Sequence, residues 1–224
     1  MAYGQISSTL LISMGVPPAA ASAGVHTAET FTTCVSGISH TLHRNVDWKL
    51  FARLVIPGVI GGVLGAYVLT SIDATVAKPF VLTYLAALGL YLFYRGVMHR
   101  HLERRPKIVS PLGLLGGFLD AAGGGGWGGI VTSNLLVQGS NPRKTIGTVN
   151  TAEFFLTITI SATFLATLGW QAFTVATVGL LIGGVFAAPF GAWIAKRVQA
   201  DTLLTFVGAL LTLVSLYGLY RALS

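Results

Sequence analysis

The sequence is poor in charge and in cysteine, and each shortage excludes a class of protein. Only 9% of its 224 residues are charged, against about 25% in soluble domains, which excludes an ordinary soluble protein. The single cysteine, Cys34, cannot form an internal disulfide, and the sequence has no Cys/His spacing of the zinc-binding kind. No lysine or arginine precedes Arg44, so the N-terminal region lacks the charged start of a cleavable signal peptide.

Apolar residues are abundant where charge is scarce. They make up 53% of the chain, and the mean hydropathy is +0.74, which indicates an integral membrane protein. Two apolar pieces, Tyr3–Gly15 and Pro111–Gln138, are short or interrupted. A helix needs roughly 20 residues to cross the hydrocarbon layer. Six runs of about that length predict membrane-spanning helices: Pro18–Leu42, Leu54–Ile72, Pro79–Met98, Pro142–Leu168, Phe173–Ala195 and Leu203–Leu223.

An internal repeat relates the two halves of the sequence. Residues 3–33 align with residues 127–157 at a constant offset of 124, with 11 of 31 positions identical, where chance gives about two. We therefore divide the chain into repeat 1 (1–98), a basic linker (99–110) and repeat 2 (111–224). The counterpart of residues 111–126 would precede residue 1, so the first arm is largely missing from repeat 1: either the start of the sequence is truncated or misassigned, or this repeat does without that arm. Duplicated halves are typical of transporters, whose sites lie where the repeats meet.

The path of Pro111–Gln138 decides whether these repeats are parallel or inverted. A full crossing gives four spans per repeat and parallel halves, whereas a hairpin gives three spans and inverted halves. With the hairpin, twelve of the fourteen Lys and Arg lie on the side of the His99–Val109 loop, against nine with a full crossing. Because cytoplasmic loops are enriched in Lys and Arg, the count favours the hairpin.

The predicted fold is therefore an all-α integral membrane protein with two inverted-topology repeats. Each repeat has three transmembrane helices plus a re-entrant or broken half-helix element. We expect a multi-pass protein of the cell (inner or plasma) membrane, with the His99–Val109 loop in the cytoplasm. The excess of basic residues, fourteen against seven acidic ones, is explained by this orientation, so no nucleic-acid partner is expected.

The stretch "DAAGGGGWGGIVTSN", Asp120–Asn134, interrupts its apolar surroundings with six glycines. Consecutive glycines break a helix, and a half-helix that starts within a membrane presents free N–H groups and about half a positive charge. Such an end binds anions. The alternative is close helix packing through small residues. The candidate anion-binding residues in the two repeats are Tyr3, Gly4 and Gln5, and Gly124, Gly125, Gly126, Trp127, Gly128 and Thr132.

Asp120 stands just before this break and has two interpretations. It is either a group that binds a proton or a cation within the membrane, where charges are rare and costly, or a carboxylate that caps the N–H groups after the break. A permanently charged carboxylate would compete with an anionic substrate. A structural or protonated role is therefore favoured.

A polar stripe marks the helix after each break. Glu29 and Glu153 occupy matched positions, with Thr and Ser at helical spacing around them, so each stripe must face the bundle interior or a wet path. Hydrogen bonding between helices and a transport path explain the stripes equally well. His26 and Asn150 are matched but differ, which makes His26 the side chain most expected to contact substrate, with Asn150 as its counterpart. Glu29 and Glu153, with Asp120, are candidates for proton coupling or a structural role.

The stretches "GGFLDAAGGGGWGGIVTSNLL" and "NPRKTIGTVNTAEFF", with "GVPPAAASAGVHTAETFTT" and "NVDWKLF" in the first half, resemble the TauE/SafE sulfite exporter family over nearly the whole chain. The resemblance implies export, or in some members uptake, of small sulfur-containing anions such as sulfite, sulfoacetate or thiosulfate, or of related organic anions. The family's glycine-rich break corresponds here to Gly123–Gly126 and Gly128.

The function expected is secondary transport that exports sulfite or an organosulfonate such as sulfoacetate, with the anion at half-helix N-termini near the midplane. The alternatives are an anion channel, or a proton-coupled importer of thiosulfate or another small organic anion. No enzyme is expected, because no nucleophile–base or metal-ligand spacing occurs. The expected partners are the small anion and the lipid bilayer, with a homo-oligomer left open. No catalytic residue, cofactor or metal is expected.

Overall fold

The computed structural model describes residues 3–98, 106–170, 177–183 and 200–223, and nearly all of them are helical. The all-α prediction is confirmed. The predicted span Phe173–Ala195 lies mostly outside the described residues. In chain order the elements are α1 (Tyr3–Ser13), α2 (Pro18–Leu42), α3 (Trp48–Ser71), α4 (Ala74–Val97), α5 (Ser110–Gly123), the π-helical η1 (Gly128–Thr132), α6 (Ser133–Val137), α7 (Pro142–Leu168) and α9 (Ala200–Leu223).

Within these residues, four helices, α3, α4, α7 and α9, are long and apolar enough to cross a membrane. The 25-residue α2 falls short in hydropathy rather than in length, because its polar stripe replaces apolar residues. Both α3 and α4 begin about one and a half turns earlier than the apolar runs predict. The side chain of Asp47 accepts from the N–H groups of Lys49 and Leu50, and that of Asp73 accepts from Thr75, which caps these extra turns. The same hydrogen bonds lower the pKa of Asp73.

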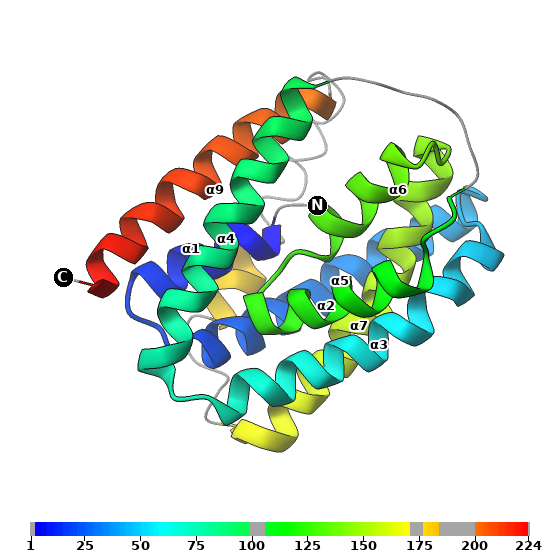
Figure 1. Ribbon diagram of the computed structural model, residues 1–224. Helices are drawn as coiled ribbons and strands as arrows, with labels where there is room; N and C mark the ends of the chain where they lie inside the picture. The colour runs from blue at the N-terminus through cyan, green and yellow to red at the C-terminus, as the bar shows by residue number, and fades with distance from the viewer. Residues whose placement is uncertain (1–2, 99–105, 171–176, 184–199, 224) are drawn as a thin grey trace.

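Matched helices of the two repeats pack against each other in antiparallel pairs (Figure 1). In the α2–α7 pair, His26 near the start of α2 lies beside Phe164 near the end of α7. His40 near the end of α2 lies 3.5 Å from Asn150 near the start of α7. The α4 and α9 helices form the second such pair.

Glycines let α3 approach α5 so closely that backbone meets backbone. A Cβ on Gly117 of α5 would overlap the carbonyl of Gly58, and one on Gly61 would overlap the carbonyl of Leu114. Only residues without side chains permit such an approach, which is the usual way membrane helices pack. This contact anchors α5 along α3.

The segment from α5 to α6 folds back on itself. It reverses at Gly124, Gly125 and Gly126, whose φ angles of 73°, 138° and 152° are accessible to glycine and strained for other residues. The side chain of Gln138, at the end of α6, accepts from the N–H groups of Lys107 and Ile108 at 2.9 Å each. The chain therefore enters and leaves this hairpin at the same end of the molecule.

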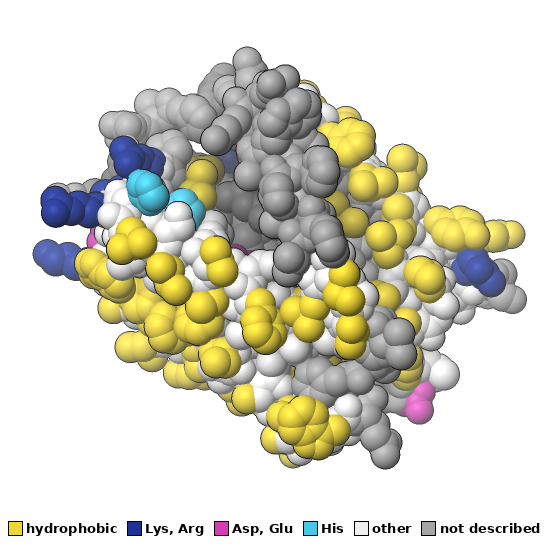
Figure 2. Space-filling model, turned by 180° about the vertical axis from the view of Figure 1, so that it is seen from behind, with side chains coloured by type: hydrophobic (Ala, Val, Ile, Leu, Met, Phe, Trp, Pro, Cys, Tyr) yellow, Lys and Arg dark blue, Asp and Glu magenta, His cyan; other side chains and the backbone are white. Residues whose placement is uncertain are grey.

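Basic side chains gather at that end of the molecule (Figure 2). The ammonium of Lys144 donates to the carbonyl of Arg44 at 2.7 Å, and the guanidinium of Arg143 donates to the side chain of Asn45 at 2.6 Å. Arg53 reaches the carbonyl of Lys107. Connections that are distant in sequence thus form one basic surface.

Candidate functional site

The start of α1 lies against the tip of the hairpin. A Cβ on Gly125 would stand 2.7 Å from the backbone N of Gln5 and equally close to the carbonyl carbon of Gly4. The hydroxyl of Ser8 donates to the carbonyl of Gly124. The half-helix starts of the two repeats, predicted as one anion site, are therefore neighbours in space.

The helix that follows the break begins as a π-helix. Helical structure starts at Trp127, continues through η1 and α6, and ends at Val137. π-Helical turns are rare and concentrate at functional sites. The sequence carried no signal for this geometry, because the glycines that break a helix do not specify how the next one winds.

Asp120 combines a helix cap with a contact to histidine. It is only 2% exposed, its Oδ1 accepts from the N–H of Trp127 at 2.8 Å, and its Oδ2 lies 3.2 Å from Nε2 of His26. Its backbone carbonyl also accepts from the N–H of Gly125. The capping geometry proposed from the sequence is thus present, with an addition that the sequence did not reveal.

His26 is fully buried and held on both sides of its ring. Its Nδ1 lies 2.8 Å from the carbonyl of Ser22, one turn earlier, while Nε2 faces Asp120. The hydroxyl of Ser22 donates to the carbonyl of Ala121 at 2.8 Å, so α2 is attached to the end of α5. Ser22 was missed at the sequence level, although its spacing of four residues from His26 places both on one face.

The two glutamates of the stripes are buried near the same place. The side chain of Glu29 packs against the start of α1, where a Cβ on Gly4 would stand 2.6 Å from Oε1. Glu153 is 9% exposed and within electrostatic reach of Glu29 and Asp120. Three acidic side chains and one histidine therefore surround the half-helix starts.

Two polar atoms at this junction lack a hydrogen-bond partner among the described residues. They are Nε2 of Gln5 and, farther along η1, Oγ1 of Thr132, both in side chains that are 1% exposed. The Gln5 amide nitrogen points at η1, 2.8 Å from where a Cβ on Gly129 would stand. Buried donors without partners cost free energy, so they mark a place where a polar ligand would be favourable.

The remaining predicted site residues lie around or away from this junction. Trp127 is fully buried, donates from Nε1 to the carbonyl of Val149 at 3.2 Å, and directs its ring at Gly58 of α3. Gly128 follows it in η1. The Tyr3 hydroxyl donates to the carbonyl of Leu180 at 2.8 Å. Asn150 lies farther along α7, beside Ser36 and His40 of α2.

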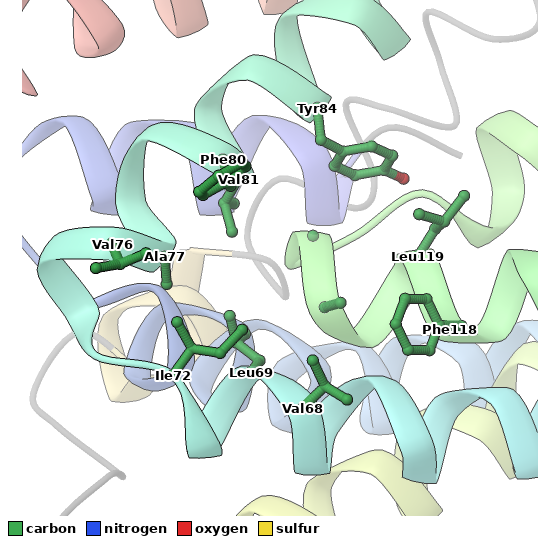
Figure 3. A pocket seen from close by; sticks show the side chains of 12 residues that line it. Val68, Leu69, Ile72, Val76, Ala77, Phe80, Val81, Tyr84, Phe118 and Leu119 are labelled. Atoms are coloured by element: carbon green, nitrogen blue, oxygen red, sulfur yellow. The ribbon is translucent and has the colours of Figure 1, made fainter.

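An apolar groove lies next to the glycine break (Figure 3). It lies between α3, α4 and α5, with a volume of about 240 Å³. The hydroxyl of Tyr84, another residue missed at the sequence level, lies 3.4 Å from the carbonyl of Gly125. The lining offers an anion almost no donors, so this groove is not the anion site. Its lining residues are Val68, Leu69, Ile72, Val76, Ala77, Phe80, Val81, Tyr84, Phe118, Leu119, Ala122 and Gly123.

Apolar helices around a buried polar junction define a multi-pass membrane protein, and comparison with known proteins gives its class as a membrane transporter. The family described as "Sulfite exporter TauE/SafE" matches residues 1–218, and the chain belongs to this family. It is 42% identical over 224 residues to the "Probable membrane transporter protein YtnM" of Bacillus subtilis (strain 168), covering 96% of this chain and 75% of that protein. No solved structure matches.

Proposed function

We propose that the protein exports small sulfur-containing anions, sulfite or organosulfonates such as sulfoacetate, and binds them where α1 meets the glycine break. The observation that carries this proposal is the contact of Gly125 with Gly4 and Gln5. It brings two half-helix starts to one point beside the unpaired amide nitrogen of Gln5.

The chemistry of this junction favours an anion. Backbone N–H groups at the start of a helix point along its axis and carry a partial positive charge. The amide nitrogen of Gln5 and the hydroxyl of Thr132 are further donors. Sulfite and sulfonate oxygens accept several hydrogen bonds at once, so one oxyanion group would satisfy groups that come from both repeats.

The antiparallel pairing of α2 with α7 supports an inverted relation between repeat 1 (1–98) and repeat 2 (111–224). The hairpin whose ends meet at Gln138 supports it too. In this proposal the two repeats alternate in opening the junction to either side of the membrane. The basic linker 99–110 and the basic surface lie in the cytoplasm, following the usual excess of Lys and Arg.

Export of an anion needs no coupled ion. With the cell interior negative, each negative charge that leaves gains about 2.3 kcal/mol per 100 mV. Coupling to protons through Glu29 or Glu153 remains an alternative mechanism. With sulfoacetate, whose charge does not change near neutral pH, a pH gradient imposed on liposomes distinguishes the two, because only coupled transport responds to the gradient at fixed membrane potential.

Sulfite efflux from liposomes with Gly125→Ala tests the site. The new Cβ would stand 2.7 Å from the Gln5 nitrogen, so α1 and the hairpin must separate, and efflux should fall at least tenfold. Gly15→Ala is the matched control: Gly15 also has positive φ, of 101°, but nothing lies within 4 Å of its added Cβ. Both glycines have a positive φ that alanine rarely adopts, so the control introduces backbone strain without the contact with Gln5. Equal efflux by the two variants would contradict the proposed site. Saturation with sulfite concentration distinguishes a transporter from a channel.

A further inference from the structure

We infer that the carboxylate of Asp120 is a built-in competitor of the transported anion. This carboxylate accepts a hydrogen bond from the Trp127 N–H, the same donor that the substrate's oxyanion group would use. Substrate binding therefore displaces the carboxylate from Trp127. This inference rests on the proposed function and goes beyond it, because it says what the site contains when the substrate is absent. It also defines the substrate chemistry: a sulfite, sulfonate or similar oxyanion group that can replace a carboxylate.

The contact of Asp120 with the second half-helix has the form of a bound ligand. Its Oδ1 accepts from the Trp127 N–H at 2.8 Å, a normal hydrogen-bond distance. A sulfonate group presents oxygens of similar size and spacing to a carboxylate. The unpaired amide nitrogen of Gln5 lies beside Gly129, two residues after Trp127, so the cluster holds one anionic group and still has an unused donor.

The first half-helix has an equivalent arrangement. The carboxylate of Glu29 packs against Gly4, at the start of α1. The start of each half-helix is therefore next to an acidic side chain of the protein itself. Such acidic neighbours repel a second anion. A site that binds anions permanently would avoid this repulsion. A transport site can use it, because the site must also release its substrate.

The surroundings of Asp120 allow it to give up the Trp127 N–H. Its second oxygen, Oδ2, is held by His26 at 3.2 Å, so the carboxylate keeps a partner after displacement. Between Asp120 and Trp127 lie Gly124, Gly125 and Gly126, whose φ angles are all positive. Glycines adjust their dihedrals at little cost, so the two residues can separate without unfolding either helix.

A permanent cap is the opposing interpretation, and the two differ in what they predict for Asp120→Asn. Asparagine keeps an oxygen that accepts from Trp127 N–H but has no charge. A permanent cap would act on the anion only through its charge, so Asp120→Asn would then tighten anion binding no more than Glu29→Gln, which removes the charge beside Gly4 without freeing the Trp127 N–H. A competitor would be weakened, so the anion should bind at least tenfold more tightly.

The test is isothermal titration calorimetry of the purified protein with sulfite and with sulfoacetate, which measures the dissociation constant of each anion. Wild type is compared with Asp120→Asn, with Glu29→Gln and with Asp73→Asn. The Asp73→Asn control removes the same charge from another helix cap, at the exposed start of α4, and should not change the dissociation constant. Asp120→Asn with affinity equal to or below that of wild type, or no tighter than that of Glu29→Gln, would overturn the inference. Wild-type protein that binds neither anion would contradict the proposed function, and this inference with it.

A second variant keeps the test decisive if Asp120→Asn does not fold. His26→Gln can still donate to Asp120 but removes an imidazole that can form an ion pair with the displaced carboxylate. It should weaken anion binding at least fivefold, in the opposite direction to Asp120→Asn. A purely structural role for the pair predicts lower thermal stability with an unchanged dissociation constant, and that result would also overturn the inference.

Discussion

Thr33 and Thr157 occupy matched positions of the two repeats, and their hydroxyl oxygens lie 3.4 Å apart. Two equivalent positions that touch each other lie where the two repeats meet, and together with the antiparallel pairing of α2 and α7 this is what an inverted relation between the repeats predicts. Gln5 and Gly129, also 124 residues apart, form a second contact of this kind. In the proposed inverted arrangement, the two-fold axis would pass both the crossing of α2 with α7 and the junction of α1 with η1.

Contacts away from the axis come in exchanged pairs. The hydroxyl of Thr27 lies 3.5 Å from that of Ser161. The equivalent positions, 124 residues away in each case, are Thr151 and Gly37. A Cβ added to Gly37 would stand 3.4 Å from the Cα of Thr151. These contacts place the polar stripes of α2 and α7 against each other. Within the described residues, the stripes therefore serve as hydrogen-bonded helix packing at the crossing, while Glu29 and Glu153 approach the proposed site.

The first prediction concerns this crossing. In a Cys34→Ala background, Thr33→Cys combined with Thr157→Cys should form a disulfide under mild oxidation, because the side chains at these positions already touch. Thr33→Cys with Thr163→Cys is the matched control, since Thr163 lies about 9 Å farther along α7. Intramolecular crosslinking is read from mobility on a non-reducing gel. Equal crosslinking of both pairs would contradict the crossing point.

Much of this arrangement could be predicted from the sequence. The offset of 124 relates residues that the structure places in contact, and the glycine run marks the helix break, because both are local or periodic properties of the chain. The Asp120–His26 contact could not be predicted, since it joins residues 94 apart through the packing of α2 on α5. The α3–α5 contact was also missed, because glycines show that close packing is allowed but not which partner is chosen.

The second prediction tests the α3–α5 contact. Gly117→Ala should destabilise the protein by about 1–3 kcal/mol, because its Cβ would overlap the rigid carbonyl of Gly58. Gly179→Ala, also in a helical segment, meets no described atom within 4 Å and should be neutral or slightly stabilising. Thermal unfolding in detergent measures both. A Gly117→Ala variant as stable as Gly179→Ala would show that α5 does not pack against α3 at this point.

The third prediction separates stability from binding at Trp127. Trp127→Phe removes the hydrogen bond from Nε1 to the Val149 carbonyl and part of a fully buried ring, so stability should fall by about 1–3 kcal/mol. The ring faces Gly58 rather than α1, so the concentration of sulfite for half-maximal efflux should change less than twofold. Trp48→Phe, at a residue that is 57% exposed, should alter neither quantity. A large change in sulfite dependence would assign the ring to the substrate pathway.

The fourth prediction concerns orientation in the membrane. Basic residues gather where the hairpin starts and ends, whereas the α3–α4 connection at the other end carries Asp73 (Figures 1 and 2). Because Lys and Arg are retained on the cytoplasmic side, Ser71→Cys should react with a membrane-impermeant maleimide in intact cells. Lys49→Cys should react only after the cells are opened. Both variants carry Cys34→Ala, and both replaced side chains are exposed, so reactivity reports the side of the membrane rather than burial. The reverse pattern would place the basic surface outside, and sulfite moving from that surface through the junction would then be imported rather than exported.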